Sequence, residues 1–287
     1  MLLSEAIQEF LEHLKVIERA HETIRAYRNV LTDFQNFMEK DFNGKVYLDE
    51  VHLDHLETYI RYRKTAGDKP VSRNRALYVF RSFYGYLQKR DLVIKDISRN
   101  LEPAAQKQVE RVYLTPNELR QLLEMIDEPL IRAAAYTLAY TGLRISELCN
   151  LCLHDVDLEN KTLQVIDGKG GKNRTLPISN KLLPHLEEYL QNIRPAMDSE
   201  RFFVSKRAKR LSPYHVNRCL KDAAAQLGWK KHVTAHVLRH TFASSLVRKN
   251  ARLPVIQRLL GHSDLRVTGN YIHQHFSDLQ DAVDSLD

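Results

Sequence analysis

The sequence has only three cysteines in 287 residues, Cys149, Cys152 and Cys219. This is too few for a disulfide framework and agrees with a reducing compartment, so we expect a cytoplasmic protein. Cys149 and Cys152 have the C-x-x-C spacing, but a zinc site would need a second pair, and a redox pair would follow a strand rather than a helix. We interpret both as small residues on a buried helix.

Long hydrophobic runs are also absent. No stretch approaches the ~20 apolar residues that cross a bilayer, and the first residues, MLLSEAIQEF, are acidic and amphipathic without the basic start of a signal peptide. The segment DGKGGKNR has no G-K-[ST] ending and no helix directly after it, so it is not a phosphate-binding P-loop. We expect no membrane association, no cofactor and no small-molecule substrate.

Positive charge is concentrated in two separate blocks. Residues 61–90 hold nine basic residues and one acidic residue, and residues 201–252 hold thirteen basic residues and one acidic residue. Solvated surfaces usually mix the two signs, so blocks of one sign indicate surfaces that bind a polyanion. Nucleic acid is the favoured partner, because neither block has the bulky apolar face of a helix that lies on a membrane.

The first hundred residues predict a helical domain. Apolar residues recur at helical spacing in four segments, at 4–17, 21–40, 51–64 and 72–90. The last segment is expected to turn its apolar residues inward and three arginines outward, namely Arg73, Arg75 and Arg81. The pattern lapses between Asp96 and Arg111, so we expect a small helical domain over 1–97 and a linker over 98–111.

A second domain is expected from residue 112 to residue 275. It opens with a capping box in which Thr115 is the N-cap, Pro116 is the first helical residue and Glu118 is the partner. The segment IRAAAYTLAYTGL predicts a central helix, and KTLQVIDGKGGKNRTLPIS predicts two short strands around a turn. Further helices are expected at 180–193, 213–227, 235–249, 254–260 and 264–273, before a tail over 276–287. The predicted fold class is mainly α with a small antiparallel sheet.

The segment HVLRH, His236 to His240, raises the question of a metal or an anion. A zinc protease helix reads H-E-x-x-H, with the glutamate as general base, whereas Val237 and Arg239 stand between these two histidines. A guanidinium has no lone pair to offer and repels a divalent cation about one turn away. We therefore expect an anion at this helix and no metal.

Five features in a fixed order carry a resemblance to a known family. TGLRISEL, GKGGKNR, HVLRH and LLGHSD follow one another, and a tyrosine lies nine residues after the histidine of LLGHSD. They resemble the tyrosine recombinases, in particular Xer-type recombinases and compact phage or transposon integrases. The resemblance implies a helical, SAM-like N-terminal DNA-binding domain, a mixed α/β catalytic domain, and a reaction that breaks and rejoins DNA.

The resemblance also assigns six catalytic residues, Arg144, Lys169, His236, Arg239, His262 and Tyr271. Two arginines suit the two non-bridging oxygens of a phosphate, because each guanidinium is a planar fork of donors. His262 would bind the same phosphate, His236 would accept the proton of the nucleophile, and Lys169 would protonate the leaving 5′-oxygen. Tyr271 would form a covalent 3′-phosphotyrosine without a metal.

Two positions depart from the usual pattern of the family. Ala235 precedes His236 where a proline is frequent, and Gly269 lies two residues before Tyr271 where a side chain is usual. Neither removes a catalytic group. Gly269 would weaken the start of a helix by roughly 0.5–1 kcal/mol relative to alanine.

Basic residues of both blocks and of the hairpin are the expected DNA contacts, namely Arg73, Arg75, Arg81, Lys172, Arg174, Arg207, Lys209 and Arg210. The resemblance implies a double-stranded recombination site, a homo-tetramer on two sites, with or without a paralogous partner, and exchange through a four-way junction. The tail over 276–287 is expected to contact a neighbouring protomer. Chromosome or plasmid dimer resolution is the favoured role. The alternatives are integration of a mobile element, a type IB topoisomerase, and a DNA-binding protein with a silent site.

Overall fold

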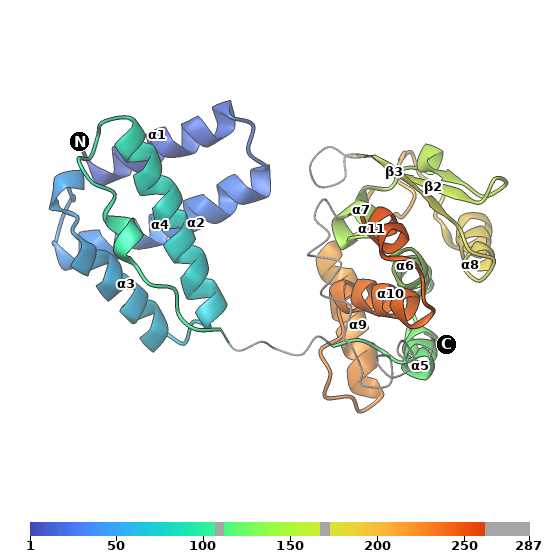
Figure 1. The fold of residues 1–287 in the computed structure, drawn as a ribbon. Coiled ribbons are helices and arrows are strands. Elements are labelled where there is room, and N and C mark those ends of the chain that lie inside the picture. The colour runs from blue at the N-terminus through green and yellow to red at the C-terminus, as the bar shows by residue number, and fades with distance from the viewer. Residues whose placement is uncertain (107–111, 167–172, 262–287) are drawn as a thin grey trace, which may run out of the picture. The chain divides into compact units, whose positions relative to one another are not determined.

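The computed structural model describes residues 1–106, 112–166 and 173–261. The fold is mainly helical with a three-stranded antiparallel sheet, which confirms the predicted fold class. The chain divides into two compact units, Met1–Val109 and Glu110–Asp287 (Figure 1). Each unit has its own hydrophobic core.

Four helices form the first unit: α1 (Leu3–Val16), α2 (His21–Asp41), α3 (Leu53–Thr65) and α4 (Pro70–Lys89). A short 3-10 turn, Leu48–Glu50, lies between α2 and α3, and another, Ile97–Asn100, follows α4. Aromatic rings join the helices. Phe34 of α2 meets Phe80 of α4 edge to face with ring centres 4.9 Å apart, and Phe10 of α1 meets Phe83 of α4 at 5.5 Å. Such edge-to-face pairs add to the stability that burial of the rings provides.

The chain after α4 remains packed on the first unit beyond residue 97. Leu101 is buried in the first core. Asn74 of α4 exchanges two hydrogen bonds with the backbone of Ala104: its Nδ2 donates to the carbonyl at 2.9 Å, and its Oδ1 accepts from the amide at 2.8 Å. Arg81 donates to the carbonyl of Leu101 at 2.7 Å. The segment 101–104 is therefore fastened along α4.

The arginines of α4 differ in exposure. Arg75 is exposed, as expected, but Arg73 and Arg81 are half-buried, and the Nε atom of each is buried. The expectation that all three point outward is wrong for these two. For Arg81 the reason is its contact with Leu101, which turns the guanidinium toward the segment 101–104 instead of toward solvent.

The second unit contains seven α-helices within its described residues, together with the sheet. They are α5 (Pro116–Met125), α6 (Pro129–Thr141), α7 (Ile145–Asn150), α8 (Leu183–Glu188), α9 (Pro213–Gln226), α10 (Ala235–Arg248) and α11 (Leu253–Leu260). A 3-10 turn, Leu153–Asp155, precedes the strands β1 (Val156–Asp157), β2 (Thr162–Val165) and β3 (Arg174–Pro177). A π-helical turn, Tyr189–Ile193, continues α8. The helix expected at 264–273 and the tail lie outside the described residues.

The helix α6 is the centre of the second unit, as its apolar sequence predicted. Helices α5, α8, α9 and α10 pack around it, and small buried residues such as Ala134 and Ala135 allow close approach. Gly142 ends the helix with a φ of 67°, and a Cβ there would lie 2.4 Å from a ring carbon of Phe242 of α10. Only glycine fits this conformation and this space. The loop after α6 therefore lies directly against α10.

The three strands form a small sheet in the order β1-β2-β3, with both pairs antiparallel. Leu163 lies opposite Leu176, and both are buried in the second core. Val165 lies opposite Arg174, so β3 begins at Arg174. This pairing confirms the predicted hairpin, whose turn, residues 167–172, lies outside the described residues.

The two cysteines of the C-x-x-C segment have different surroundings. Cys149 is buried on α7, and burial raises the pKa of its thiol to about 11. Cys152 follows the helix and is only partly buried. The prediction of a buried helical residue is thus confirmed for Cys149 and wrong for Cys152.

Candidate active site

The HVLRH segment forms the first turns of α10. Thr234 caps this helix, because its Oγ1 accepts a hydrogen bond from the amide of Val237 at 3.4 Å. Arg239 is only 3% exposed. Its Nη1 donates to the carbonyl of Gly142 at 2.6 Å, and its Nη2 donates to the carbonyl of Leu260 at 2.7 Å. Both carbonyls belong to helix C-terminal ends, which carry partial negative charge and stabilise a buried cation.

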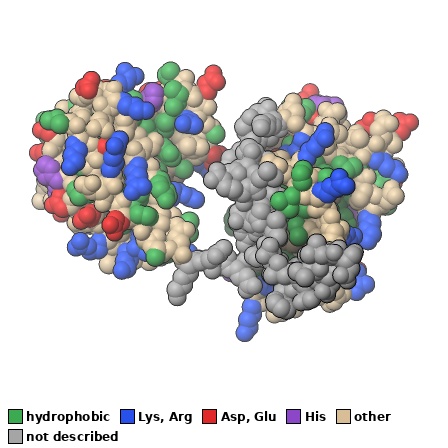
Figure 2. Space-filling model, viewed as in Figure 1, with side chains coloured by type: hydrophobic (Ala, Val, Ile, Leu, Met, Phe, Trp, Pro, Cys, Tyr) green, Lys and Arg blue, Asp and Glu red, His purple; other side chains and the backbone are tan. Residues whose placement is uncertain are grey.

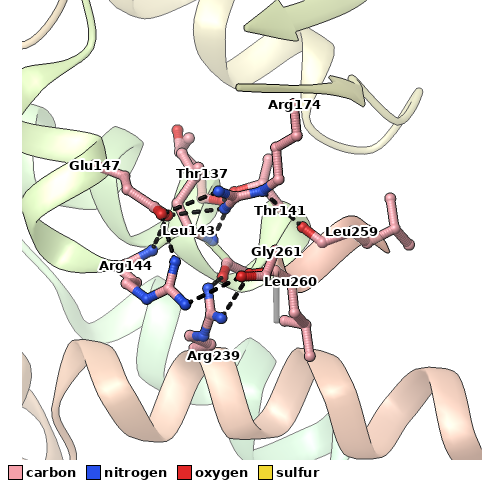
Figure 3. A network of polar contacts seen from close by, with 11 residues as sticks. Thr137, Thr141, Leu143, Arg144, Glu147, Arg174, Arg239, Leu259, Leu260 and Gly261 are labelled. Carbon is pink, nitrogen blue, oxygen red and sulfur yellow. Dashed lines mark hydrogen bonds and ion pairs between the residues drawn. The ribbon is translucent and has the colours of Figure 1, made fainter. Parts of the chain in front are cut away.

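Arg144 lies beside Arg239 at the start of α7 (Figure 3). Its Nη1 donates to Oε1 of Glu147 at 2.7 Å, and its backbone amide donates to Oε2 of the same carboxylate, also at 2.7 Å. Its Nη2 lies 3.4 Å from the carbonyl oxygen of Gly261. The side chain is 26% exposed, so solvent reaches Arg144 although it hardly reaches Arg239.

Glu147 is shared between two arginines. Arg174 of β3 makes a bidentate contact with Glu147: its Nη1 donates to Oε1 at 3.0 Å and its Nη2 donates to Oε2 at 2.8 Å (Figure 3). The Nε of Arg174 donates to the carbonyl of Leu259 at 3.0 Å. Burial alone would raise the pKa of Glu147, but the hydrogen bonds from Arg174 and Arg144 outweigh it, and the pKa falls to about 2. The carboxylate is therefore charged at neutral pH.

Gly261 completes the arrangement at the end of α11. Its φ of 64° is left-handed, and a Cβ there would lie 2.9 Å from Nη1 of Arg174. Glycine is thus required for the backbone conformation and for the close approach of Arg174. As a result, the end of α11 contacts Arg144, Arg174 and Arg239 at three successive carbonyls.

Positive charge exceeds negative charge in this network. Figure 3 draws three guanidiniums, of Arg144, Arg174 and Arg239, and one carboxylate, of Glu147. Arg144 and Arg174 share the carboxylate of Glu147, and Arg239 donates to the carbonyls of Gly142 and Leu260. Guanidinium groups gathered in this way offer several hydrogen-bond donors to an anion such as phosphate.

Arg174 is a correction to the expected DNA contacts. Its side chain is 8% exposed, and all three of its nitrogens donate to protein oxygens. It lies in a basic stretch of sequence, but its partner, Glu147, precedes it by 27 residues. Sequence reasoning also missed Glu147, although a glutamate three residues after a helix-capping position is a recognisable signal.

The two histidines of HVLRH contact each other. The Nε2 atoms of His236 and His240 lie 2.8 Å apart, so one ring donates and the other accepts. His236 is exposed, and His240 is 8% exposed. The exposed ring of His236 is accessible to a substrate, on the same helix as Arg239.

Four expected site residues lie outside the described residues: Lys169, Lys172, His262 and Tyr271. The structure brings Arg144 and Arg239 together at the end of α11, and His236 lies one turn before Arg239 on α10. His262 directly follows Gly261 in the chain. Ala235, which stands where the family often has proline, is the buried first residue of α10.

The basic surfaces are exposed to different degrees. Arg207, Lys209 and Arg210 are exposed in the loop before α9. Lys209 lies 3.7 Å from Asp198, and both side chains are largely exposed, so this ion pair contributes little stability. Figure 2 shows Lys and Arg side chains spread across the visible face of the first unit. Because these Lys and Arg side chains are already exposed in the folded protein, they are accessible to a polyanion.

Two groups of side chains in the described part of the chain have metal-ligand chemistry: Glu128 with His215 and Cys219, and Cys152 with His154 and Asp155. Neither group includes the HVLRH helix. In the first group Arg218 contacts the ring of His215 at 3.2 Å, which places a permanent cation against a candidate ligand. In the described residues no helix is long and apolar enough to span a membrane.

Two family descriptions match the chain. The Phage integrase family matches residues 112–278, and the Phage integrase N-terminal SAM-like domain matches residues 7–91. The first match covers more than half of the chain, and together they include most of both units.

Similar proteins span nearly the whole chain. Tyrosine recombinase XerA of Pyrococcus furiosus is 33% identical, over 99% of this chain and 94% of its own length. Tyrosine recombinase XerC of Thermodesulfovibrio yellowstonii is 32% identical, over 97% of this chain and 94% of its own length.

Solved structures show the same fold. The crystal structure of XerA recombinase is 31% identical, with a TM-score of 0.56 over 99% of this chain and 98% of that one. An integrase of transposon Tn1549 in complex with transposon right end DNA has a TM-score of 0.80 at 20% identity, over 100% of this chain and 99% of that one. A λ integrase tetramer bound to a Holliday junction has a TM-score of 0.75 at 18% identity, over 92% of this chain and 78% of that one.

Proposed function

Because this chain belongs to the phage integrase family and is a tyrosine recombinase of the Xer type, an enzyme that breaks and rejoins DNA at specific sites, we propose that it recombines DNA through Tyr271. The observation that carries the proposal is the convergence of Arg144 and Arg239 on the end of α11. This gives a compact cationic site beside an exposed histidine, with one family-matched residue, His262, next in the chain.

In the proposed site the two arginines bind the scissile phosphate. During attack at phosphorus, negative charge builds up on the two non-bridging oxygens. Each guanidinium offers paired donors to these oxygens from a direction that its protein contacts fix. Pre-arranged donors of this kind are worth ~10²-fold or more in rate each. A metal ion is not needed for this neutralisation.

The bond changes follow from the groups at hand. The phenol oxygen of Tyr271 forms a bond to phosphorus, and His236 accepts its proton. The bond from phosphorus to the 5′-oxygen breaks, and Lys169 donates a proton to that oxygen. His262 donates a hydrogen bond to the phosphate. The 3′-phosphotyrosine retains the energy of the broken ester, so a new 5′-hydroxyl can displace the tyrosine without ATP.

In the proposed assembly both units bind one duplex. Residues 1–97 form a core-binding DNA-binding domain, to which the segment 101–104 also belongs because it packs on α4. The linker is therefore confined to the residues between this segment and residue 112. Residues 112–275 form the catalytic domain, and residues 276–287 form a tail that contacts a neighbouring protomer. Exposed Arg75, Arg207, Lys209 and Arg210, together with Lys172 and half-buried Arg73, contact the phosphate backbone. Four protomers act on two sites through a four-way junction, and the λ integrase tetramer supports this by likeness of fold.

Within the family we favour resolution of chromosome or plasmid dimers over integration of a mobile element. The support is the likeness to XerA and XerC at more than 30% identity over nearly full length. The transposon integrase, by contrast, is only 20% identical and shares the fold alone.

The test begins with selection of the bound DNA site from a random library. A supercoiled plasmid with two directly repeated copies of that site is then incubated with the full chain in excess chelator. The proposal predicts two circles, each with one site, and no products from a plasmid without sites. Relaxed topoisomers from the plasmid without sites would instead identify a type IB topoisomerase. A requirement for added divalent ion would contradict the metal-free mechanism.

A further inference from the structure

The geometry points to a role for Arg174 that the proposed mechanism does not contain: Arg174 is a positioning residue that orients Arg144 toward the phosphate. It acts through Glu147 and through the end of α11. This inference rests on the proposed function of the same site.

The guanidinium of Arg174 is fully engaged by protein oxygens. Nη1 and Nη2 donate to the two oxygens of Glu147 at 3.0 and 2.8 Å, and Nε donates to the carbonyl of Leu259 at 3.0 Å. Its side chain is 8% exposed, so it has little surface to offer DNA. Only a planar fork with a third donor can reach all three acceptors. The single nitrogen of a lysine cannot reproduce this geometry.

Glu147 transmits the constraint to Arg144. Oε1 accepts from Nη1 of Arg174 and from Nη1 of Arg144, and Oε2 accepts from Nη2 of Arg174 and from the amide of Arg144. The two-point contact with Arg174 prevents rotation of the carboxylate. The other hydrogen bond of Arg144, to Gly261, is long at 3.4 Å. The direction of the Arg144 guanidinium therefore depends mainly on the orientation of Glu147.

The end of α11 depends on Arg174 as well. Nε of Arg174 holds the carbonyl of Leu259, and the absence of a Cβ at Gly261 allows Nη1 to approach. The next carbonyl, of Leu260, binds Arg239. Arg174 thus contacts groups that hold both Arg144 and Arg239, the two arginines of the proposed clamp. It would not contact the phosphate itself.

The test uses the full chain with Arg174→Met and with Arg174→Lys, which keeps the positive charge but not the planar fork of donors. A matched control is Arg194→Met, because Arg194 likewise donates to several backbone carbonyls, those of Ser199, Arg201 and Phe202, but not to Glu147. A nicked suicide duplex with the selected site reports affinity and single-turnover cleavage separately. Both Arg174 variants should bind DNA within about 2-fold of wild type and cleave roughly 10²-fold more slowly. Arg194→Met should cleave at the wild-type rate.

A second substrate separates positioning from loss of structure. A methylphosphonate at the scissile position is neutral, so it depends less on the arginine clamp. The ratio of wild-type to Arg174→Met cleavage rates should shrink on this substrate, as it should for Arg144→Met. An unchanged ratio would overturn the inference, because a general structural defect affects both substrates equally.

Two other results would also overturn it. The first is a wild-type rate for Arg174→Lys. The second is an Arg174→Met protein that cleaves bound DNA at the wild-type rate but binds DNA with a weaker salt dependence. A slope of log affinity against log salt that is flatter by ~0.9 would identify Arg174 as a direct phosphate contact. Failure of the proposed function is a separate outcome, because wild type itself would then form no covalent adduct.

Discussion

Glu147 contributes to the candidate site in a way that matching of sequence motifs does not reveal. The TGLRISEL segment predicted Arg144 from its flanking residues, and the structure places that arginine beside Arg239. The carboxylate three residues later was not singled out, because in a sequence it looks like an ordinary helix-start glutamate. Only the fold brings Arg174 to it from 27 residues further along the chain. For the same reason, Arg174 could not be distinguished from the neighbouring basic residues of the hairpin.

Replacing Glu147 with Gln should destabilise the protein strongly. The amide keeps the shape and one acceptor oxygen, but it leaves buried Arg174 without a counter-ion. Loss of one partner of a buried ion pair typically costs about 3 kcal/mol or more. We expect a decrease of this order in the free energy of unfolding at pH 7, measured by urea denaturation. As a control, Glu159→Gln alters an exposed carboxylate and should leave the urea midpoint unchanged.

The contribution of Glu147 to the free energy of unfolding should also depend on pH. Its pKa is about 2 in the folded protein and 4.5 ordinarily, so the unfolded chain takes up the proton first as the pH falls. The stabilisation is complete above the ordinary pKa and is lost progressively toward pH 2. The difference in unfolding free energy between wild type and Glu147→Gln should therefore narrow from about pH 5 to about pH 3. A constant difference over that range would show that Glu147 does not titrate in this way.

Helices and strands were the most predictable parts of this molecule. The apolar spacing predicted α1 to α4, and the pattern around DGKGGKNR predicted the hairpin of β2 and β3. The capping box at Thr115 is present, with Oγ1 of Thr115 accepting from the amide of Glu118 at 3.2 Å. The packing of the segment 101–104 was not predictable, because the segment belongs to no helix or strand, has no apolar periodicity and is held by the side chains of α4.

Asn74→Ala should release the segment 101–104 from α4. The substitution removes both hydrogen bonds to Ala104, one as donor and one as acceptor, from a side chain that is 4% exposed. We expect a loss of about 1–2 kcal/mol in stability and faster hydrogen exchange at the amide of Ala104. The graded control is Asn74→Asp, which keeps the acceptor for the amide of Ala104 but faces its carbonyl with a second oxygen, so exchange of that amide should be intermediate. An unchanged rate of hydrogen exchange at the amide of Ala104 in Asn74→Ala would show that Asn74 does not hold the segment 101–104 on α4.

The whole molecule presents basic side chains from each of its two units, and this distribution was visible in the sequence as two blocks of charge. The basic residues differ in exposure: Arg207, Lys209 and Arg210 are exposed. Arg81 of the first block and Arg174 of the hairpin instead donate hydrogen bonds to protein oxygens. The two blocks of positive charge predicted that the partner is a polyanion. They did not predict which basic residues contact DNA, because a count of charges contains no information on burial.

Neutralising Arg207, Lys209 and Arg210 to Gln should weaken binding to all DNA sequences alike. These side chains are exposed and suit the phosphate backbone, which has no sequence information. Each lost contact should flatten the slope of log affinity against log salt by ~0.9. Arg25→Gln, at an exposed residue of α2 paired with Glu22, is the control and should leave the slope unchanged. Loss of preference for the selected site at a fixed slope would instead make these residues base readers.

The central claim, covalent strand exchange through Tyr271, is tested most directly by one adduct measurement. Tyr271 lies outside the described residues, and its assignment rests on its position after LLGHSD. Tyr271→Phe removes a single hydroxyl, so DNA affinity should stay near that of wild type, because the phosphate contacts supply it. Both proteins are incubated with a nicked suicide duplex and run on a denaturing gel. Wild type should give a slow protein–DNA band whose linked peptide contains Tyr271, and Tyr271→Phe should give no such band. A covalent band from the phenylalanine variant would assign the nucleophile to another residue and contradict the account.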